Sequence, residues 1–230
     1  MAMLRDLTCF FMLMVFSSLS VQAGVIIGGT RLIYDGSKKE ATLNLSNPDD
    51  TPYLMQSWVE PAKQGDKSPF LITPPLFRLD GGSQNLLRVI LKDTSLPEDR
   101  ESLYWMSIKS IPSSKKDDDR NTLQLAIKTR IKLIYRPASL QDKTPLMVAN
   151  KLNWKIKGDY LVVTNTTPYY MNFIDVKVGG EDVTDANVAA PKAETTFKLT
   201  SKHKLGDQVT WKVINDYGGL SDEYIYCLKK

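Results

Sequence analysis

The sequence predicts an all-β protein built from two β-sandwich domains. Short runs of β-branched, aromatic and leucine residues recur at roughly 8–12-residue spacing with turn residues between them, as in sandwiches. No segment shows the apolar spacing of an amphipathic helix. A polar stretch bounded by Pro137 and Pro145 divides the chain into two parts, each close to about 100 residues, a common domain size.

The first 23 residues are predicted to be a cleavable signal peptide. Arg5 precedes an apolar run from Cys9 to Phe16, and small and polar residues follow up to a cleavage site after Ala23. The run is shorter than the roughly 20 residues that a membrane span needs. We therefore expect an exported chain without membrane insertion.

The predicted N-terminal domain comprises residues 24–143. Its strands are expected over residues 41–46, 53–59, 70–79 with a corner at 73–75, 85–91, 103–111 and 123–135. Asn, Asp, Pro and Gly at residues 47–50 and 81–82 supply the turns between them.

The predicted C-terminal domain comprises residues 144–230, with strands over 161–164 and 170–178 and glycine turns at 179–180 and 218–219. Cys227 is the only cysteine outside the signal peptide, so this exported chain must depend on its apolar cores. We expect Cys227 to be a small buried residue of the last strand.

Residues 123–137, LQLAIKTRIKLIYRP, combine an apolar row with a cationic row. The apolar positions alternate and are Leu123, Leu125, Ile127, Ile131, Leu133 and Tyr135. Between them lie Lys128, Arg130 and Lys132. The residues alone leave two interpretations open: a half-buried strand with a solvated face, or an edge strand whose apolar row needs a partner.

The sequence offers no catalytic, metal or nucleic-acid motif. The single histidine, His203, lies between two lysines, and no nucleophile elbow, zinc motif or phosphate loop is present. A net charge of +4 without a basic cluster does not favour nucleic-acid binding. We therefore expect no enzyme activity, no cofactor and no bound metal.

Residues 96–113, LPEDRESLYWMSIKSIPS, resemble the motif of the periplasmic pilus chaperones of the chaperone–usher pathway. Further motifs follow the order of that family: residues 30–36, 73–75, 123–137, 165–170 and 215–219. The resemblance spans nearly all of the mature chain. It implies two immunoglobulin-like sandwiches in a boomerang arrangement, a periplasmic location and, together with the tight Pro-Pro corner, a cis X-Pro bond near Thr73-Pro74.

The resemblance also assigns a role to the apolar row. In this family a donor strand, here about residues 122–136, fills the open groove of an incomplete pilus (fimbrial) subunit with alternate side chains. The matching positions are Leu123, Leu125 and Ile127. The brief segment from Pro112 to Thr122 is typical of the short-loop sub-type. The implied function is to bind, fold and cap subunits by donor-strand complementation and to deliver them to an outer-membrane usher.

The resemblance implies two further sets of charged residues. Arg31 and Lys132 match the basic pair that holds the C-terminal carboxylate of the subunit, whereas Lys128 and Arg130 are interpreted as solvated. Glu101, Arg136 and Asp216 match a buried charge network that sets the angle between the domains.

An alternative function is a secreted structural or adhesive immunoglobulin-like protein, including a pilus subunit itself. A subunit would have a free alternating N-terminal arm and would lack a final strand. The short segment Gly24–Gly29 and the complete strand set of the first domain do not favour that alternative.

Overall fold

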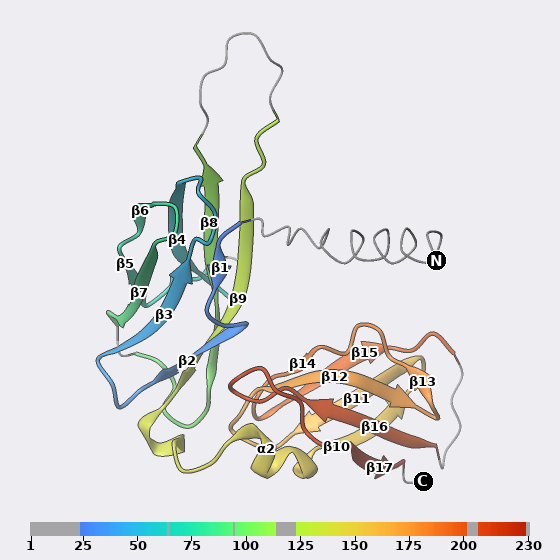
Figure 1. The fold of residues 1–230 in the computed structure, drawn as a ribbon. Helices are drawn as coiled ribbons and strands as arrows, with labels where there is room; N and C mark the ends of the chain where they lie inside the picture. Colours follow the sequence, from blue (N-terminus) through green and yellow to red (C-terminus); the bar gives the residue numbers. More distant parts are fainter. Residues whose placement is uncertain (1–23, 64, 94, 114–122, 202–206, 229–230) are drawn as a thin grey trace, which may run out of the picture.

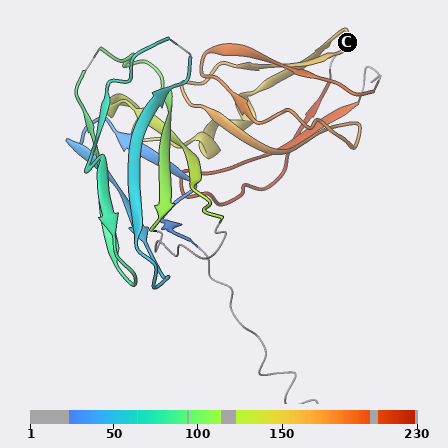
Figure 2. The same cartoon turned by 90° about the horizontal axis from the view of Figure 1, so that it is seen from above.

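The protein forms two β-sandwiches joined at an angle (Figures 1 and 2). The computed structural model describes residues 24–230 except 64, 94, 114–122, 202–206 and 229–230. The predicted signal peptide, His203 and most of the segment that predicts the short-loop sub-type lie outside the described residues. The strand content confirms the predicted all-β class. Within the described ranges no helix is long and apolar enough to cross a membrane, and no group of potential ligands could hold a metal ion.

The N-terminal sandwich pairs a four-stranded sheet, β1-β3-β7-β5, with a five-stranded sheet, β2-β9-β8-β4-β6. Its strands are β1 (Ile26–Ile27), β2 (Arg31–Asp35), β3 (Glu40–Ser46), β4 (Tyr53–Pro61), β5 (Phe70–Thr73), β6 (Leu76–Leu79), β7 (Gln84–Leu91), β8 (Ser102–Pro112) and β9 (Ile127–Arg136). Alternate side chains of the two sheets meet in one core, in which Leu45, Met55 and Leu133 are fully buried. The Thr73-Pro74 bond between β5 and β6 is cis, as predicted.

The N-terminal segment changes sheets between β1 and β2. β1 pairs antiparallel with β3, whereas β2 pairs parallel with β9. The crossing brings Gly28 so close to β3 that a Cβ atom there would lie 3.0 Å from the carbonyl oxygen of Asn44, which explains the glycine. Because β2 covers β9 only from Lys132 to Arg136, the preceding half of β9 keeps a free edge among the described strands.

The linker contains three short helical turns, η1 (Ala138–Leu140), α2 (Pro145–Val148) and η2 (Ala149–Lys151). Pro145 is one of the two prolines predicted to bound the polar stretch between the domains. In the structure it begins α2, where its fixed φ angle and missing N–H are compatible with a first helical turn.

The C-terminal sandwich pairs a sheet of β10-β11-β15 with a sheet of β13-β12-β16-β17, to which β14 adds beside β12. Its strands are β10 (Asn153–Lys157), β11 (Tyr160–Asn165), β12 (Met171–Val178), β13 (Glu181–Asp182), β14 (Val188–Ala189), β15 (Ala193–Lys198), β16 (Gln208–Val213) and β17 (Tyr224–Cys227). The rings of Trp154 and Trp211, 5.3 Å apart, lie in a core separate from that of the first sandwich.

The expectation that Cys227 is buried is wrong, because the residue is exposed. β17 is the last strand in its sheet order, and its side chains alternate between the core and solvent. Tyr224 and Tyr226 pack against the core, so Ile225 and Cys227 point outward.

Candidate functional site

The apolar row of β9 runs from the core of the first sandwich to its surface. Ile131 and Leu133 are buried, whereas Ile127, Leu125 and Leu123 are 55 %, 67 % and 86 % exposed. The interpretation as an ordinary half-buried strand, with its apolar face in the chain's own core, therefore does not hold for these last three side chains. Three large apolar side chains in succession on one exposed row are unusual for an isolated soluble domain and indicate a surface that takes a partner.

Regular strand structure in this segment begins at Ile127, later than the predicted start near residue 122. The pairing of β8 with β9 ends at Ser110 and Ile127, and the described residues before Ile127 form no ladder with another strand. Residues 123–126 nevertheless continue the line of β9 beyond the sandwich (Figure 1). Along Ile127–Ile131 only β8 pairs with β9 among the described strands, so one row of backbone groups is available to another strand.

The structure brings Arg31 and Lys132 together. They are direct register partners in the parallel pair of β2 and β9. Both side chains reach the second sandwich: the Lys132 ammonium donates to Oδ1 of Asn172 at 2.6 Å, and Nη1 of Arg31 donates to the carbonyl oxygen of Ile214 at 3.4 Å. The pair therefore lies where the two sandwiches meet.

Both cations are held in an environment that disfavours their charge. Burial, together with the smaller effect of the neighbouring charge of Arg31, lowers the pKa of Lys132 to about 8. Burial also lowers the pKa of Arg31, against the opposing effect of Asp216. The buried Nε of Arg31 has no hydrogen-bond partner within the described part of the chain. Two adjacent, partly desolvated cations with an unused donor have the chemistry to bind an anion, and a carboxylate suits an arginine fork next to a lysine.

Glu101, Arg136 and Asp216 form one ion-pair network between the sandwiches. Nε of Arg136 donates to Glu101 at 2.7 Å, and its two terminal nitrogens donate to the two oxygens of Asp216 at 2.8 Å each. The second oxygen of Glu101 accepts the backbone N–H of Tyr170 in the second sandwich at 2.7 Å. The guanidinium also lies over the Tyr169 ring, 5.5 Å from its centroid.

The burial of this network affects its two main members differently. Burial raises the pKa of Glu101 to about 7, although Arg136 acts in the opposite direction. Burial alone would lower the pKa of Arg136, but its hydrogen bonds and charge contacts with Asp216 and Glu101 raise it. Removing one carboxylate would leave a buried guanidinium with an incomplete set of partners, which is costly.

Lys128 and Arg130, predicted to be solvated, belong to a third charged cluster that no local sequence pattern indicates. The two oxygens of Glu60 on β4 pair with Lys128 at 3.0 Å and with Arg130 at 3.1 Å. The Lys128 ammonium lies over the ring of Trp58 at 4.9 Å, and the Arg130 guanidinium lies over Trp105 at 4.6 Å.

Glu60 also binds the strand that lies between β4 and β9. It accepts hydrogen bonds from Nε1 of Trp58 at 2.9 Å and from the hydroxyl of the buried Ser107 on β8 at 3.0 Å. One carboxylate thus connects three adjacent strands at the base of the exposed apolar row. These contacts, led by the hydrogen bond from Trp58, lower the pKa of Glu60 to about 2.

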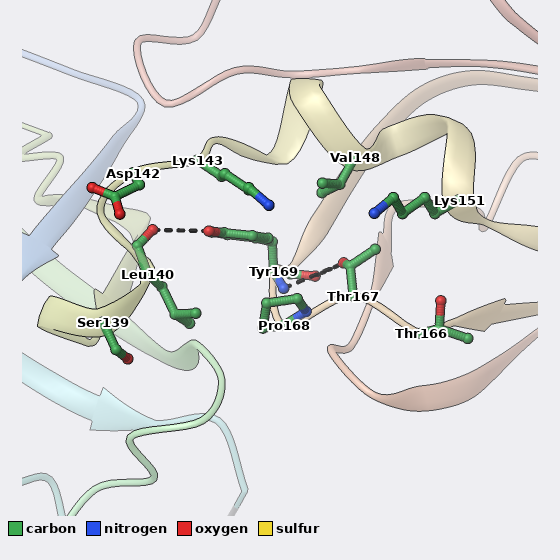
Figure 3. Close-up of a pocket in the computed structure, with 10 residues that line it drawn as sticks. All are labelled: Ser139, Leu140, Asp142, Lys143, Val148, Lys151, Thr166, Thr167, Pro168 and Tyr169. Atoms are coloured by element: carbon green, nitrogen blue, oxygen red, sulfur yellow. Dashed lines mark hydrogen bonds between the residues drawn. The ribbon is translucent and has the colours of Figure 1, made fainter.

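A pocket of about 430 Å³ lies between the linker and the second sandwich (Figure 3). Val148 and Lys151 line it from the linker side, and the hydroxyl of Tyr169 donates to the carbonyl oxygen of Leu140 at 2.8 Å. It contains none of the residues that the sequence predicted for the site, so it is a separate feature.

Two family comparisons divide the chain in the same order as its sandwiches. Residues 24–141 match the family described as pili and flagellar-assembly chaperone, PapD N-terminal domain. Residues 147–225 match pili assembly chaperone PapD, C-terminal domain.

Curated relatives and solved structures are similar over most of the chain. The chaperone protein FimC of Escherichia coli K12 is 43% identical over 203 residues, which cover 87% of this chain and 83% of that protein. The probable fimbrial chaperone LpfB of Escherichia coli O157:H7 is 39% identical and covers 91% of each chain. A chain of the Salmonella enterica SafA pilin complex with the SafB chaperone has a TM-score of 0.82 at 38% identity, covering 91% of this chain and 98% of that one.

Proposed function

This chain belongs to the family of pilus-assembly chaperones, and we propose from that membership that it is a periplasmic chaperone which binds, folds and caps pilus subunits by donor-strand complementation. The capped subunit would then be delivered to an outer-membrane usher. In this proposal the donor strand supplies Leu123, Leu125 and Ile127 to the subunit's open groove, while Arg31 and Lys132 hold its C-terminal carboxylate. Glu101, Arg136 and Asp216 fix the angle between the domains.

One observation supports this function above the others: the exposed apolar row leads directly into β9, the strand whose Lys132 lies beside Arg31 of β2 in a partly desolvated cation pair. Burial of the three apolar side chains in a groove contributes roughly 5–9 kcal/mol before the costs of association, at about 1.5–3 kcal/mol each. The carboxylate contact fixes the register, because a slip by one residue would turn the row away from the groove.

The proposed partners are a pilus subunit and an outer-membrane usher. Support for the subunit comes from SafB, a similar chaperone whose structure was solved with the SafA pilin. We propose no nucleic-acid partner, no insertion into a membrane, no cofactor and no enzyme activity, in line with membership of a chaperone family. The signal peptide, residues 1–23, would export the chain, and we place the domain division between residues 143 and 144.

The alternative of a pilus subunit or an adhesive immunoglobulin-like protein is disfavoured. The curated relatives are named as chaperones, and the family matches cover both sandwiches. The described residues of the first sandwich also form nine strands in two sheets, including β9 as a last strand.

The test is co-expression with the pilus subunits encoded beside the chaperone's own gene, followed by co-purification from periplasmic extract. We expect a one-to-one complex in which the subunit resists added protease. Subunits that remain equally soluble and protected without the chaperone would contradict the proposal.

A further inference from the structure

The backbone nitrogen of Gly24 makes a specific contact with a carboxylate. It donates to Oδ2 of Asp49 at 2.9 Å, and the hydroxyl of Tyr53 donates to the same oxygen at 2.8 Å. Gly24 directly follows the predicted cleavage site after Ala23, and the match to the N-terminal family domain begins at the same residue. Cleavage there would therefore place a new charged terminus against an acidic side chain.

Asp49 is held in position independently of Gly24. It lies in the turn between β3 and β4, where its own N–H donates to Oδ1 of the buried Asn47 at 3.1 Å. The Asn47 amide in turn donates to the carbonyl oxygen of Thr51 at 2.9 Å, and Gly82 donates to the carbonyl oxygen of Asp49 at 3.2 Å. The carboxylate is thus preorganised on a rigid turn.

The Gly24 contact fixes the start of a segment that borders the donor strand. Val25 and Ile27 pack against the core of the first sandwich. A small cavity of about 50 Å³ separates this segment from β9 and is lined on one side by Gly24 and Ile27 and on the other by Ile127 and Thr129. The position of β1 therefore shapes the surface beside Ile127, where the donor strand leaves the sandwich.

We propose that removal of the signal peptide creates an ion pair between the α-ammonium of Gly24 and Asp49, which seats β1 beside the donor strand and makes subunit capture by the processed chain faster. A signal peptidase hydrolyses the Ala23–Gly24 bond with one water molecule. The new carboxyl group leaves with Ala23, and its proton ends on the Gly24 amine. The inference rests on the proposed export and function of the chain.

Cleavage converts the Gly24 nitrogen from a neutral amide into a charged ammonium, and this change distinguishes the processed chain from the uncleaved one. An amide N–H gives Asp49 one neutral hydrogen bond, whereas an ammonium gives a charge-assisted one, which is shorter and stronger. A free α-amino group has a pKa of about 7.7–8.0, and an adjacent carboxylate raises it. Tyr53 is the other titratable group on this carboxylate, and its hydrogen bond to Asp49 raises the pKa of the Tyr53 hydroxyl. The residues that line the small cavity from β4, β8 and β9 carry no titratable group.

The first experiment measures the pKa of the α-amino group in the purified, processed full chain. The terminal amine is labelled by reductive ¹³C-methylation and titrated by NMR, in the parent and in Asp49→Asn. We expect the parent value to lie about half a unit above that of Asp49→Asn, the size of a surface ion pair. Equal values in the two proteins would overturn the ion pair.

The second experiment displaces the charge without changing the acidic turn. A chain that keeps one additional alanine before Gly24 is compared with the parent by hydrogen exchange of the Gly28 amide, which donates to Asn44 beside β1. We expect exchange about two- to fivefold faster in the extended chain at pH 7, and equal in both above the α-amino pKa. Equal exchange at pH 7 would also overturn the inference, and this variant remains informative if Asp49→Asn folds poorly.

Subunit capture separates this inference from the proposed function. We expect the parent to capture its subunit up to about fivefold faster than the extended chain. If parent and extended chain capture equally, the link between processing and capture is wrong although the function stands. If neither captures while the raised α-amino pKa is observed, the proposed function fails and the ion pair stands.

Discussion

Arg31 and Lys132 occupy the same register position of the parallel pair formed by β2 and β9, so two cations lie side by side at the junction of the sandwiches. Neither cation has a carboxylate partner among the salt bridges of the described residues, although the charge of Asp216 acts to raise the pKa of Arg31. Burial and the neighbouring charge disfavour the charged form of Lys132 in the free protein, and a bound anion would offset both effects.

Replacing either cation is expected to prevent subunit capture while leaving the chain folded. Arg31→Ala or Lys132→Ala each removes a charge-assisted contact worth about 1.5–3 kcal/mol, and the donor strand loses its register anchor. Co-purification with the subunit and circular dichroism of each variant are the measurements. Lys151→Ala, which changes an exposed lysine outside the site, is the matched control. Folded cation variants that still protect subunits would show that the assignment is wrong.

Capture is expected to weaken as the pH rises above about 8. Burial lowers the pKa of Lys132 to about 8 in the free protein, and a bound carboxylate raises that pKa again. Binding therefore takes up a proton above this pH, so affinity is constant below it and then falls by up to about tenfold per pH unit. Calorimetric titration between pH 7 and 10 measures the effect. Lys132→Arg, whose guanidinium does not titrate in this range, is expected to show a flat profile.

Leu125→Glu is expected to fail in a different way. The variant keeps the contact of Arg31 and Lys132 with the subunit carboxylate, but it would bury the charge of the new glutamate in the apolar groove of the subunit. We expect weak, salt-sensitive encounter complexes and subunits that remain open to proteolysis. Ile225→Glu changes an equally exposed apolar residue in the second sandwich and serves as the control. Normal protection of subunits by Leu125→Glu would contradict the donor role of this position.

Loss of either acidic partner of Arg136 is expected to lower stability more than it changes the capture surface. Glu101→Ala or Asp216→Ala leaves a buried guanidinium without one of its carboxylates, at a cost of about 3–5 kcal/mol. Thermal unfolding followed by circular dichroism measures this cost. Glu194→Ala removes an exposed partner of Lys155 and should leave the melting temperature nearly unchanged. A melting temperature equal to that of the parent for both network variants would refute their structural role.

Glu60→Ala is expected to increase the mobility of residues 127–131, where the donor strand joins the sandwich. Lys128 and Arg130 lose their shared carboxylate, so amide exchange over residues 127–131 should become up to about fivefold faster, and the fluorescence of Trp58 and Trp105 should change. Because the pKa of Glu60 is lowered to about 2 from 4.5, its contribution is present above pH 4.5 and is lost as the pH falls toward 2. Asp80→Ala, which removes an exposed pair with Arg78, is the control. Unchanged exchange in Glu60→Ala would exclude a positioning role.

The strands and the apolar row were predictable from the sequence because both depend on alternation within short segments. The apolar residues from Leu123 to Tyr135 keep the same alternation along the whole segment. Leu133 is nevertheless buried and Leu123 exposed, because burial depends on which other strands cover each residue. Periodicity gives the direction of a side chain but not what covers it. For this reason the residues alone left the two interpretations of the row open.

Contacts between distant strands were not predictable in the same way. Glu60 meets Lys128 across 68 positions of sequence, and Asn172 meets Lys132 across 40. Neither partner carries a local motif that indicates the contact. Cys227 was misplaced for a related reason, since alternation in β17 is equally compatible with either face and the packing of Tyr224 and Tyr226 decides between them.

The parallel pairing of β2 with β9 sets a limit on any strand that extends this sheet. β2 begins at Arg31, opposite Lys132, so an added strand along the free edge of β9 must stop there. A chain whose C-terminus reaches Lys132 would run in the same direction as β9 and would end, in line, at the start of β2. The edge from Leu123 to Lys132 is about 30 Å long at 3.3 Å per residue. The fold would thus limit the length of the added strand. A terminal strand of about ten residues would fit along this edge, whereas a longer strand would collide with the first residue of β2.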